Sequence, residues 1–157
     1  MAVRPTSDRL RETLFNIIAP RIEDVRFLDL CAGTGAVGIE ALSRGARYAT
    51  FVDRSRRSCQ LIESNVELCR IPEEQFEIYQ MPAEDYLRQS KDYPWDIIFF
   101  DPPYQEDYLR TLNLLGTFEG LVVVEHHHKN TLPEEIGSLV RTRILKQGDS
   151  SLSFYEG

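Results

Sequence analysis

The chain has 157 residues, a hydrophobic fraction of 42% and a formal net charge of −7. This length predicts one compact domain over residues 1–157, with enough apolar side chains to build a core. No apolar stretch approaches the roughly 20 residues of a membrane-spanning helix, and no signal-peptide pattern opens the chain. We therefore expect a cytoplasmic protein without a membrane partner.

The chain alternates apolar strand-like runs with helical stretches, which is typical of a parallel sheet covered by helices on both faces. Thr6, Ser7 or Asp8 can cap the start of a first helix. This helix is predicted to end near Ala19, because Pro20 cannot continue it. Further helices are predicted over residues 39–44, 55–70 and 106–115, and strands over residues 27–31, 48–52, 75–79, 96–100, 121–124, 139–146 and 151–155. We expect an α/β fold with a mostly parallel seven-stranded sheet, whose last two strands form an antiparallel hairpin at one edge.

A glycine-rich turn joins the first predicted strand to the helix behind it. Gly33, Gly35 and Gly38 satisfy the spacing G-x-G-x-x-G. Asp53 follows at the end of the next strand, where an acid that binds ribose hydroxyls is expected. Strand, turn, helix and acid together favour a nucleotide-binding unit over a purely structural turn.

The charge beside this turn distinguishes two possible ligands. NAD would place its pyrophosphate on backbone N–H groups at the helix N-terminus, and Asp29 adds negative charge at that point. S-adenosylmethionine carries a sulfonium and an α-ammonium group but no phosphate. An acid beside the turn and a second acid, Asp53, match that charge pattern, so the sequence favours S-adenosylmethionine over NAD.

The tetrapeptide Asp101-Pro102-Pro103-Tyr104 follows the apolar run over residues 95–100. Two successive prolines fix the backbone and remove two N–H donors, so the carbonyl groups of Asp101 and Pro102 are held in a stiff loop. A carboxylate and a fixed carbonyl can accept the two N–H bonds of an amino group, while Tyr104 offers a ring for stacking. The tetrapeptide indicates a site that binds a planar amine. A proline-rich turn that merely ends a strand is the alternative.

The basic residues are unevenly distributed. Residues 1–57 contain ten arginines and seven acidic residues, which gives +3, whereas the remaining residues contain eight basic and 18 acidic residues, which gives −10. Nucleic-acid affinity depends on a local cluster rather than on the total charge. Arg4, Arg9 and Arg11 lie in one short segment, which favours contact with phosphates. Salt bridges to neighbouring acids would produce the same composition.

Three successive histidines, His126, His127 and His128, form the strongest metal-binding candidate in the sequence. Successive residues of a strand point to opposite faces, so we expect that the three cannot converge on one ion. Cysteines and carboxylates at metal-ligand spacing are missing from the sequence. We therefore predict a loop after the fifth strand and no metal site.

Several segments together resemble one family. Residues 4–16, 28–35 and 101–104 are similar to the successive signatures of bacterial 16S ribosomal RNA guanine-N2 methyltransferases of the RsmD type, and residues 148–155 are similar to their last hairpin strand. The first segment is the specific one, since glycine-rich loops and Asp-Pro-Pro-Tyr motifs occur in many methyltransferases. Members usually begin with a basic β-hairpin ahead of this segment. The chain starts at Met1, so we expect that hairpin to be absent.

The resemblance implies a Rossmann-like class I fold that binds S-adenosylmethionine. Family members often carry Asp or Asn at the position of Pro82, so adenine recognition is expected from the Ala83 backbone or from Glu84 and Asp85. The implied cofactor-binding residues are Asp29, Cys31, Ala32, Gly33, Thr34, Gly35, Asp53, Arg54, Ala83 and Glu84.

The resemblance also implies an enzyme that methylates the N2 amine of a guanine in 16S ribosomal RNA. The expected substrate is this RNA within a partly assembled small ribosomal subunit. The enzyme's implied catalytic motif is Asp101, Pro102, Pro103 and Tyr104, and its RNA-binding residues are Arg4, Thr6, Arg9 and Arg11. Methylation of adenine-N6 or another amino group, an NAD-dependent oxidoreductase and a catalytically silent RNA-binding module are the alternatives.

Overall fold

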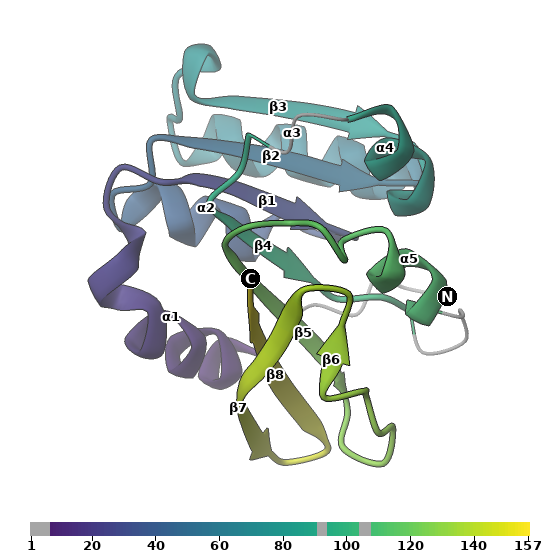
Figure 1. Cartoon of the computed structure of the whole chain (residues 1–157). Helices are drawn as coiled ribbons and strands as arrows, with labels where there is room; N and C mark the ends of the chain where they lie inside the picture. Colours follow the sequence, from purple (N-terminus) through teal and green to yellow (C-terminus); the bar gives the residue numbers. More distant parts are fainter. Residues whose placement is uncertain (1–6, 91–93, 104–107) are drawn as a thin grey trace.

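The computed structural model describes residues 7–90, 94–103 and 108–157, which form one eight-stranded sheet with helices on both faces (Figure 1). The helices are α1 (Asp8–Ile22), α2 (Ala36–Ser43), α3 (Arg56–Leu68), α4 (Ala83–Gln89) and α5 (Tyr108–Asn113), with a short 3-10 helix over Glu73–Gln75. The strands are β1 (Arg26–Leu30), β2 (Tyr48–Asp53), β3 (Phe76–Gln80), β4 (Ile97–Phe100), β5 (Leu121–His127), β6 (Glu135–Ile136), β7 (Leu139–Gln147) and β8 (Ser150–Glu156). In the part of the chain described, every helix is too short or too polar to cross a bilayer.

The strand order is β3-β2-β1-β4-β5-β8-β7-β6. The first five strands of this order are parallel, and β8, β7 and β6 pair in an antiparallel manner. The expected mostly parallel sheet with a C-terminal antiparallel hairpin is confirmed. The expected number of seven strands is wrong by one, because the two residues of β6 are too few to show an alternating pattern in the sequence.

The order of the strands reverses between β1 and β4. β1 connects forward to β2 on one side, whereas its other neighbour, β4, comes later in the chain. Leu30 at the end of β1 pairs with Phe100 at the end of β4, so the two following loops leave the sheet side by side. In doubly wound sheets such a reversal opens the crevice in which ligands bind.

Apolar side chains fill both faces of the sheet. All four residues of β4 are buried, which explains why this strand has a continuous apolar sequence rather than an alternating one. On one face Phe15 of α1 packs with Phe27 and Val123, and on the other Leu112 of α5 packs with Val122. These two layers hold the carboxyl ends of the strands in fixed positions.

Two predicted boundaries are wrong. The Ser7 hydroxyl accepts a hydrogen bond from the Leu10 N–H and caps α1 as expected, but the helix continues through Pro20 to Ile22. Proline removes only one hydrogen bond there, and the buried side chains of Ile18 and Ile22 anchor the last turn to the core. The predicted loop over the three histidines is wrong for the first two, because β5 pairs with β8 as far as His127.

The glycine-rich turn after β1 requires glycine at two positions. Gly35 is the N-cap of α2 and adopts a φ of 81°, in the left-handed region that glycine occupies without strain. Gly38 lies against β2, and a Cβ atom placed on it would come within 2.4 Å of Cε2 of Phe51. The absence of a Cβ atom at Gly38 therefore allows α2 to pack closely on the sheet.

We expect Gly38→Ala to destabilise the protein by about 1–3 kcal/mol, because the added methyl group overpacks the contact with Phe51. Without that contact, replacing a helical glycine by alanine would stabilise by roughly 0.5–1 kcal/mol. Urea unfolding of both forms measures the difference. In a Phe51→Leu background, which lacks the contacting ring atoms, the cost should shrink; an equal or absent cost in both backgrounds would contradict the packing argument.

Candidate cofactor and acceptor site

A cavity of about 270 Å³ lies at the carboxyl edge of the sheet, where the loops after β1, β2 and β4 meet the starts of α4 and α5. It is lined by Cys31, Asp53, Arg54, Pro82, Ala83, Glu84, Phe100, Pro103, Arg110 and Thr111. Five of these residues belong to the predicted cofactor-binding set and one, Pro103, to the predicted catalytic motif. The structure thus brings together, in one cavity, residues from both predicted sites.

Asp53, at the end of β2, links this cavity to the glycine-rich turn. Its Oδ2 accepts a hydrogen bond from the Gly33 N–H at 2.9 Å, and its Oδ1 accepts one from the Ser55 N–H at 2.9 Å. Each carboxylate oxygen has a second lone pair, so a half-buried Asp53 can still accept bonds from ribose hydroxyls. The same side chain thereby fixes the turn after β1 and faces the cavity.

Asp29 lies beneath the glycine-rich turn, inside β1. Its side chain is buried, and its Oδ2 accepts a hydrogen bond from the Gly38 N–H at 3.0 Å. Burial raises the pKa of this carboxyl well above its usual range, although the hydrogen bond from Gly38 works in the opposite direction. Asp29 stands outside the set of residues that line the cavity. Its direct contact with a cofactor stays a prediction, and the structure gives it the role of positioning the turn.

The turn itself is braced by hydrogen bonds from neighbouring elements. The Ala32 N–H donates to the Val52 carbonyl at 3.0 Å, and the Gly35 N–H donates to the Ala32 carbonyl at 2.8 Å. The Asn65 side chain in α3 donates to the Thr34 carbonyl at 2.8 Å. The sequence does not reveal the role of Asn65, because this residue lies 31 residues after its partner and outside any motif.

The predicted catalytic motif, residues 101–104, follows β4 directly in the sequence and is called the acceptor motif below. The Asp101 N–H donates to the Leu30 carbonyl at 3.3 Å, which ties the motif to the end of β1. Asp101 is half-buried, Pro102 is buried, and the exposed Pro103 lines the cavity. Tyr104, the fourth predicted catalytic residue, lies outside the described residues. Within the described part of the motif, Pro103 lines the cavity, and Asp101 and Pro102 directly precede it in the chain.

Two arginines form ion pairs with Glu84, and of these two Arg110 lines the cavity. Arg88 Nη2 and Arg110 Nη2 lie 2.7 Å and 2.9 Å from Glu84 Oε1. The hydrogen bond from Arg88 and the charge of Arg110 lower the pKa of Glu84. Arg110 was missed by the sequence analysis because its partner is 26 residues away, on another helix.

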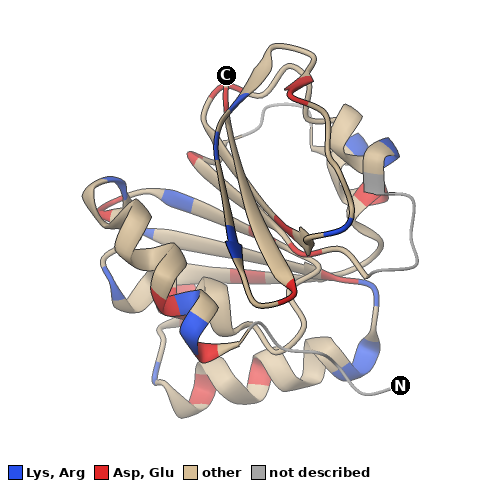
Figure 2. Cartoon of the chain, turned by 90° about the horizontal axis from the view of Figure 1, so that it is seen from below, with Lys and Arg blue, Asp and Glu red and all other residues tan. Residues whose placement is uncertain are grey.

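The predicted RNA-binding residues have different surroundings. Arg4 and Thr6 lie outside the described residues, and Arg9 is exposed in the first turn of α1. Arg11 instead contacts Asp8 at 3.1 Å and Glu40 at 3.2 Å. For Arg11 the alternative of intramolecular salt bridges therefore holds. Figure 2 shows the resulting alternation of basic and acidic segments at the start of α1.

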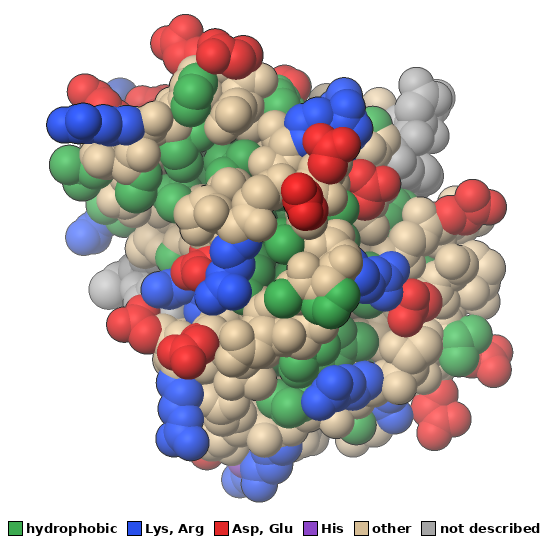
Figure 3. Space-filling model, turned by 90° about the vertical axis from the view of Figure 1, so that its left-hand side faces the viewer, with side chains coloured by type: hydrophobic (Ala, Val, Ile, Leu, Met, Phe, Trp, Pro, Cys, Tyr) green, Lys and Arg blue, Asp and Glu red, His purple; other side chains and the backbone are tan. Residues whose placement is uncertain are grey.

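Glu40 receives a second arginine, Arg44, at 2.7 Å. Burial opposes ionisation of Glu40, but the hydrogen bonds from Arg44 and Arg11 lower its pKa overall. On the face seen in Figure 3, many of the described Lys and Arg side chains lie beside Asp or Glu, whereas some near the lower edge do not. Most of the positive charge on this face thus has negative charge next to it.

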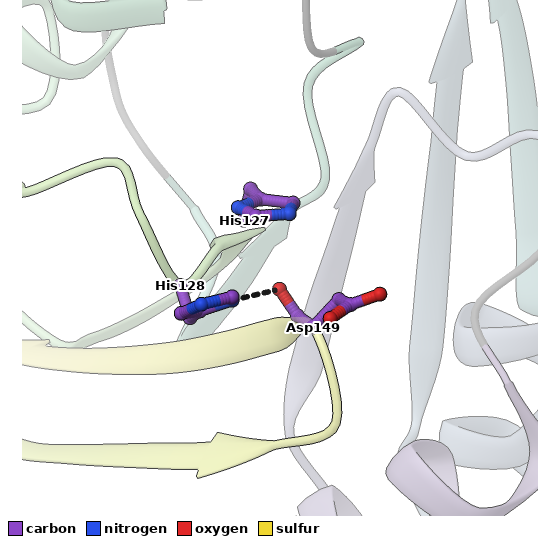
Figure 4. Close-up of side chains that lie close together, drawn as sticks. All are labelled: His127, His128 and Asp149. Atoms are coloured by element: carbon purple, nitrogen blue, oxygen red, sulfur yellow. Dashed lines mark hydrogen bonds between the residues drawn. The ribbon is translucent and has the colours of Figure 1, made fainter.

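Two of the three histidines, His127 and His128, lie together, although successive side chains of a strand would point to opposite faces. The rings of His127 and His128 stack with centroids 4.6 Å apart, and possible ligand atoms of these residues and Asp149 lie within 4.8 Å of one another (Figure 4). The reason is that β5 ends at His127 and the chain turns at His128. Successive side chains of a turn can therefore point the same way.

The hydrogen bonds of these rings limit their use as metal ligands. His128 Nδ1 lies 3.1 Å from the Asp149 carbonyl and must donate to it, which leaves the Nε2 lone pair accessible. His127 Nδ1 accepts from the Lys129 N–H at 3.1 Å, so the neutral ring carries its proton on Nε2. Binding at His127 would require breaking the bond to Lys129. The expectation of no metal site stays a prediction.

The amino-acid sequence matches a family model and several known proteins. A family model described as conserved hypothetical protein 95 matches residues 1–156. The putative ribosomal RNA methyltransferase YlbH of Bacillus subtilis is 36% identical over 163 residues, which cover 99% of this chain and 88% of the relative. The ribosomal RNA small subunit methyltransferase D of Escherichia coli K12 is 41% identical over 137 residues, which cover 83% of this chain and 68% of the relative.

Solved structures share the fold. The structure of putative methyltransferase yhhF from Escherichia coli has a TM-score of 0.86 and 34% identity, and the match covers 97% of this chain and 87% of that one. The structure of SMU.776, described as a putative methyltransferase complexed with SAH, has a TM-score of 0.77 at 16% identity and covers 94% of this chain and 49% of that one. The expected Rossmann-like methyltransferase fold is confirmed.

We expect Asp29→Asn to change how stability depends on pH. Because burial raises the pKa of Asp29, the folded protein binds its proton more tightly than the unfolded chain, whose Asp titrates near pH ~3.9. The wild type should therefore lose stability relative to the variant as the pH rises from that value towards the raised pKa, by at most about 1.4 kcal/mol per pH unit. Urea unfolding across this pH range measures the difference.

An Asp29→Asn curve parallel to that of the wild type would contradict the effect of burial on Asp29.

Proposed function

The chain belongs to the RsmD-type family of ribosomal RNA methyltransferases, and from this premise we propose that it methylates the exocyclic N2 amine of a guanine in 16S ribosomal RNA. The observation that carries the proposal is that Pro103 lines the cavity, while Asp101 directly before Pro102-Pro103 is tied by its N–H to the Leu30 carbonyl at the end of β1. A methyl donor in the cavity and an amine at the motif would lie next to each other. Holding two reactants in line can lower the activation barrier by about 7–11 kcal/mol in well-oriented systems.

The cavity suits S-adenosylmethionine, the cofactor of this family. Asp53 presents carboxylate oxygens to ribose hydroxyls, and Pro82 and Ala83 offer a small apolar wall for an aromatic base. The cofactor supplies a methyl group on a positively charged sulfur. Asp53 lines the cavity, and Asp29 and Asp53 accept two N–H groups of the glycine-rich turn, which are the kind of backbone donor that a pyrophosphate would use. These features support the methyl donor over NAD.

The acceptor motif provides the chemistry for a weak nucleophile. The lone pair of a guanine amine is delocalised into the ring, so the amine attacks poorly when planar. The Asp101 carboxylate and the Pro102 carbonyl can accept its two N–H bonds, which favours a pyramidal nitrogen and directs the lone pair away from the ring. Asp101 also offsets the positive charge that develops on nitrogen. Stacking of the base on Tyr104 is part of the proposal.

The substrate is expected to be 16S ribosomal RNA within a partly assembled small subunit, which would place the protein in the cytoplasm. The printed names of the relatives support ribosomal RNA as the substrate class. Arg9, Arg4 and Thr6 are the proposed phosphate-binding residues of the N-terminal segment. Arg11 is removed from that set, because its guanidinium contacts Glu40 and Asp8.

We expect Asp101→Ala to abolish methyl transfer while retaining cofactor binding, because Asp101 acts on the acceptor amine. A loss of about 100-fold or more is expected, as for other groups that act chiefly in the transition state. Asp101→Asn, whose carbonyl can still accept one N–H bond, should retain part of the rate. The assay is tritiated methyl transfer to small-subunit RNA, or to particles from cells lacking the activity, followed by nucleoside analysis.

Label in N2-methylguanosine would support the substrate assignment, whereas label in N6-methyladenosine or in protein would defeat it. Full activity of Asp101→Ala would defeat the mechanism.

We expect Arg9→Gln and Arg11→Gln to have different effects. Arg9→Gln should weaken RNA binding and reduce the slope of log K against log salt by roughly one, because one phosphate contact is lost. Arg11→Gln should leave that slope unchanged and lower the free energy of unfolding by up to about 1 kcal/mol, since it breaks partly exposed ion pairs. RNA titrations at several salt concentrations and urea unfolding distinguish the two. A reversed pattern would return Arg11 to the RNA interface.

A further inference from the structure

One wall of the cavity is charged and bridges two helices. Glu84 lies in the first turn of α4 and Arg110 lies in α5, and both residues line the cavity. Their side chains join at 2.9 Å between Arg110 Nη2 and Glu84 Oε1. Arg88 reaches the same oxygen at 2.7 Å, yet it stands outside the residues that line the cavity. Two arginines therefore share one carboxylate, and only one of them faces the cofactor site.

Stability does not account for this arrangement. The side chain of Arg110 is 68% exposed and that of Arg88 is 57% exposed. Ion pairs of this exposure contribute little to stability, since water and salt screen them. The pairing does, however, hold the Arg110 guanidinium at the rim of the cavity, and both arginines lower the pKa of Glu84.

Another part of the cavity wall is small and apolar. Pro82 and Ala83 form this part, directly before Glu84 in the chain. A guanidinium is planar and weakly hydrated, and it stacks on aromatic faces more readily than an ammonium group does. A planar base that lies in the cavity against Pro82 and Ala83 and stacks on Arg110 would cover the exposed face of the guanidinium and exclude water from it.

We propose that Arg110 is a cofactor-recognition residue that covers the adenine of S-adenosylmethionine, and that Glu84 anchors it for this purpose. The inference rests on the cofactor named under the proposed function. It assigns α5 to recognition of the methyl donor, in addition to its place after the acceptor motif. A change in Arg110 thus affects binding of the adenine-containing ligands, whereas a change in Arg88 does not.

The test is isothermal titration calorimetry of the full chain with S-adenosylhomocysteine and with adenosine. Arg110→Ala should raise both dissociation constants about tenfold, within the range of a desolvated cation–π contact. Arg110→Lys keeps the charge but loses the planar group, so it should recover less than half of that effect. Arg88→Ala is the matched control, because it removes an arginine from the same carboxylate; its dissociation constants should stay within twofold of the wild type.

A second measurement concerns the anchor. Glu84→Gln should weaken binding, and combining it with Arg110→Ala should weaken binding by less than the product of the two separate effects, because both changes remove one arrangement. Thermal unfolding of each variant should stay close to that of the wild type, which shows that binding rather than folding has changed.

The outcomes separate the inference from the function on which it rests. If the wild type fails to bind S-adenosylhomocysteine, the cofactor assignment fails. If the wild type binds and Arg110→Ala binds equally well, or if Arg88→Ala weakens binding as much as Arg110→Ala does, the role of Arg110 is overturned while the cofactor assignment stands.

Discussion

The geometry of the candidate site depends on the carboxyl groups of Asp29 and Asp53, which bind backbone N–H groups of the turn after β1. Asp29 accepts the Gly38 N–H from within the sheet, and Asp53 accepts the Gly33 N–H from the end of the neighbouring strand. A turn with glycine at positive φ has little stiffness of its own, so these bonds determine where its backbone lies.

The buried position of Asp29 makes this bracing costly. The Asp29 carboxyl is removed from water, and this burial outweighs the hydrogen bond from the Gly38 N–H, so its pKa is raised and its protonated form is favoured. Asp53 stands only partly buried and bonds two N–H groups, so its charge is better compensated. The deeper acid therefore sets the geometry of the turn, and the shallower one remains exposed to a ligand.

The local parts of the fold could be predicted from the sequence, but the contacts between distant segments could not. Apolar runs and glycine spacing indicate the strands, the turn and Asp53, because the relevant signals lie within a few residues of each other. The partners of Arg11 and Arg110 lie 29 and 26 residues away. Nothing in the composition of α1 distinguishes an arginine that bonds Glu40 from one that bonds a phosphate, and only the packing of α1 against α2 decides between them.

The same limitation explains why the predicted ends of β5, at the histidines, and of α1, at Pro20, are wrong. Alternation along a strand predicts that neighbouring side chains diverge, but the rule ends where the strand ends, and that end was placed too early for His127. The proline rule likewise weighs one lost hydrogen bond without the burial of Ile22 that offsets it. In each case a local preference of a few kcal/mol or less is overridden by a tertiary contact. Functional residues that act through such contacts, as Glu84 and Arg110 do, are therefore found from the fold rather than from motifs.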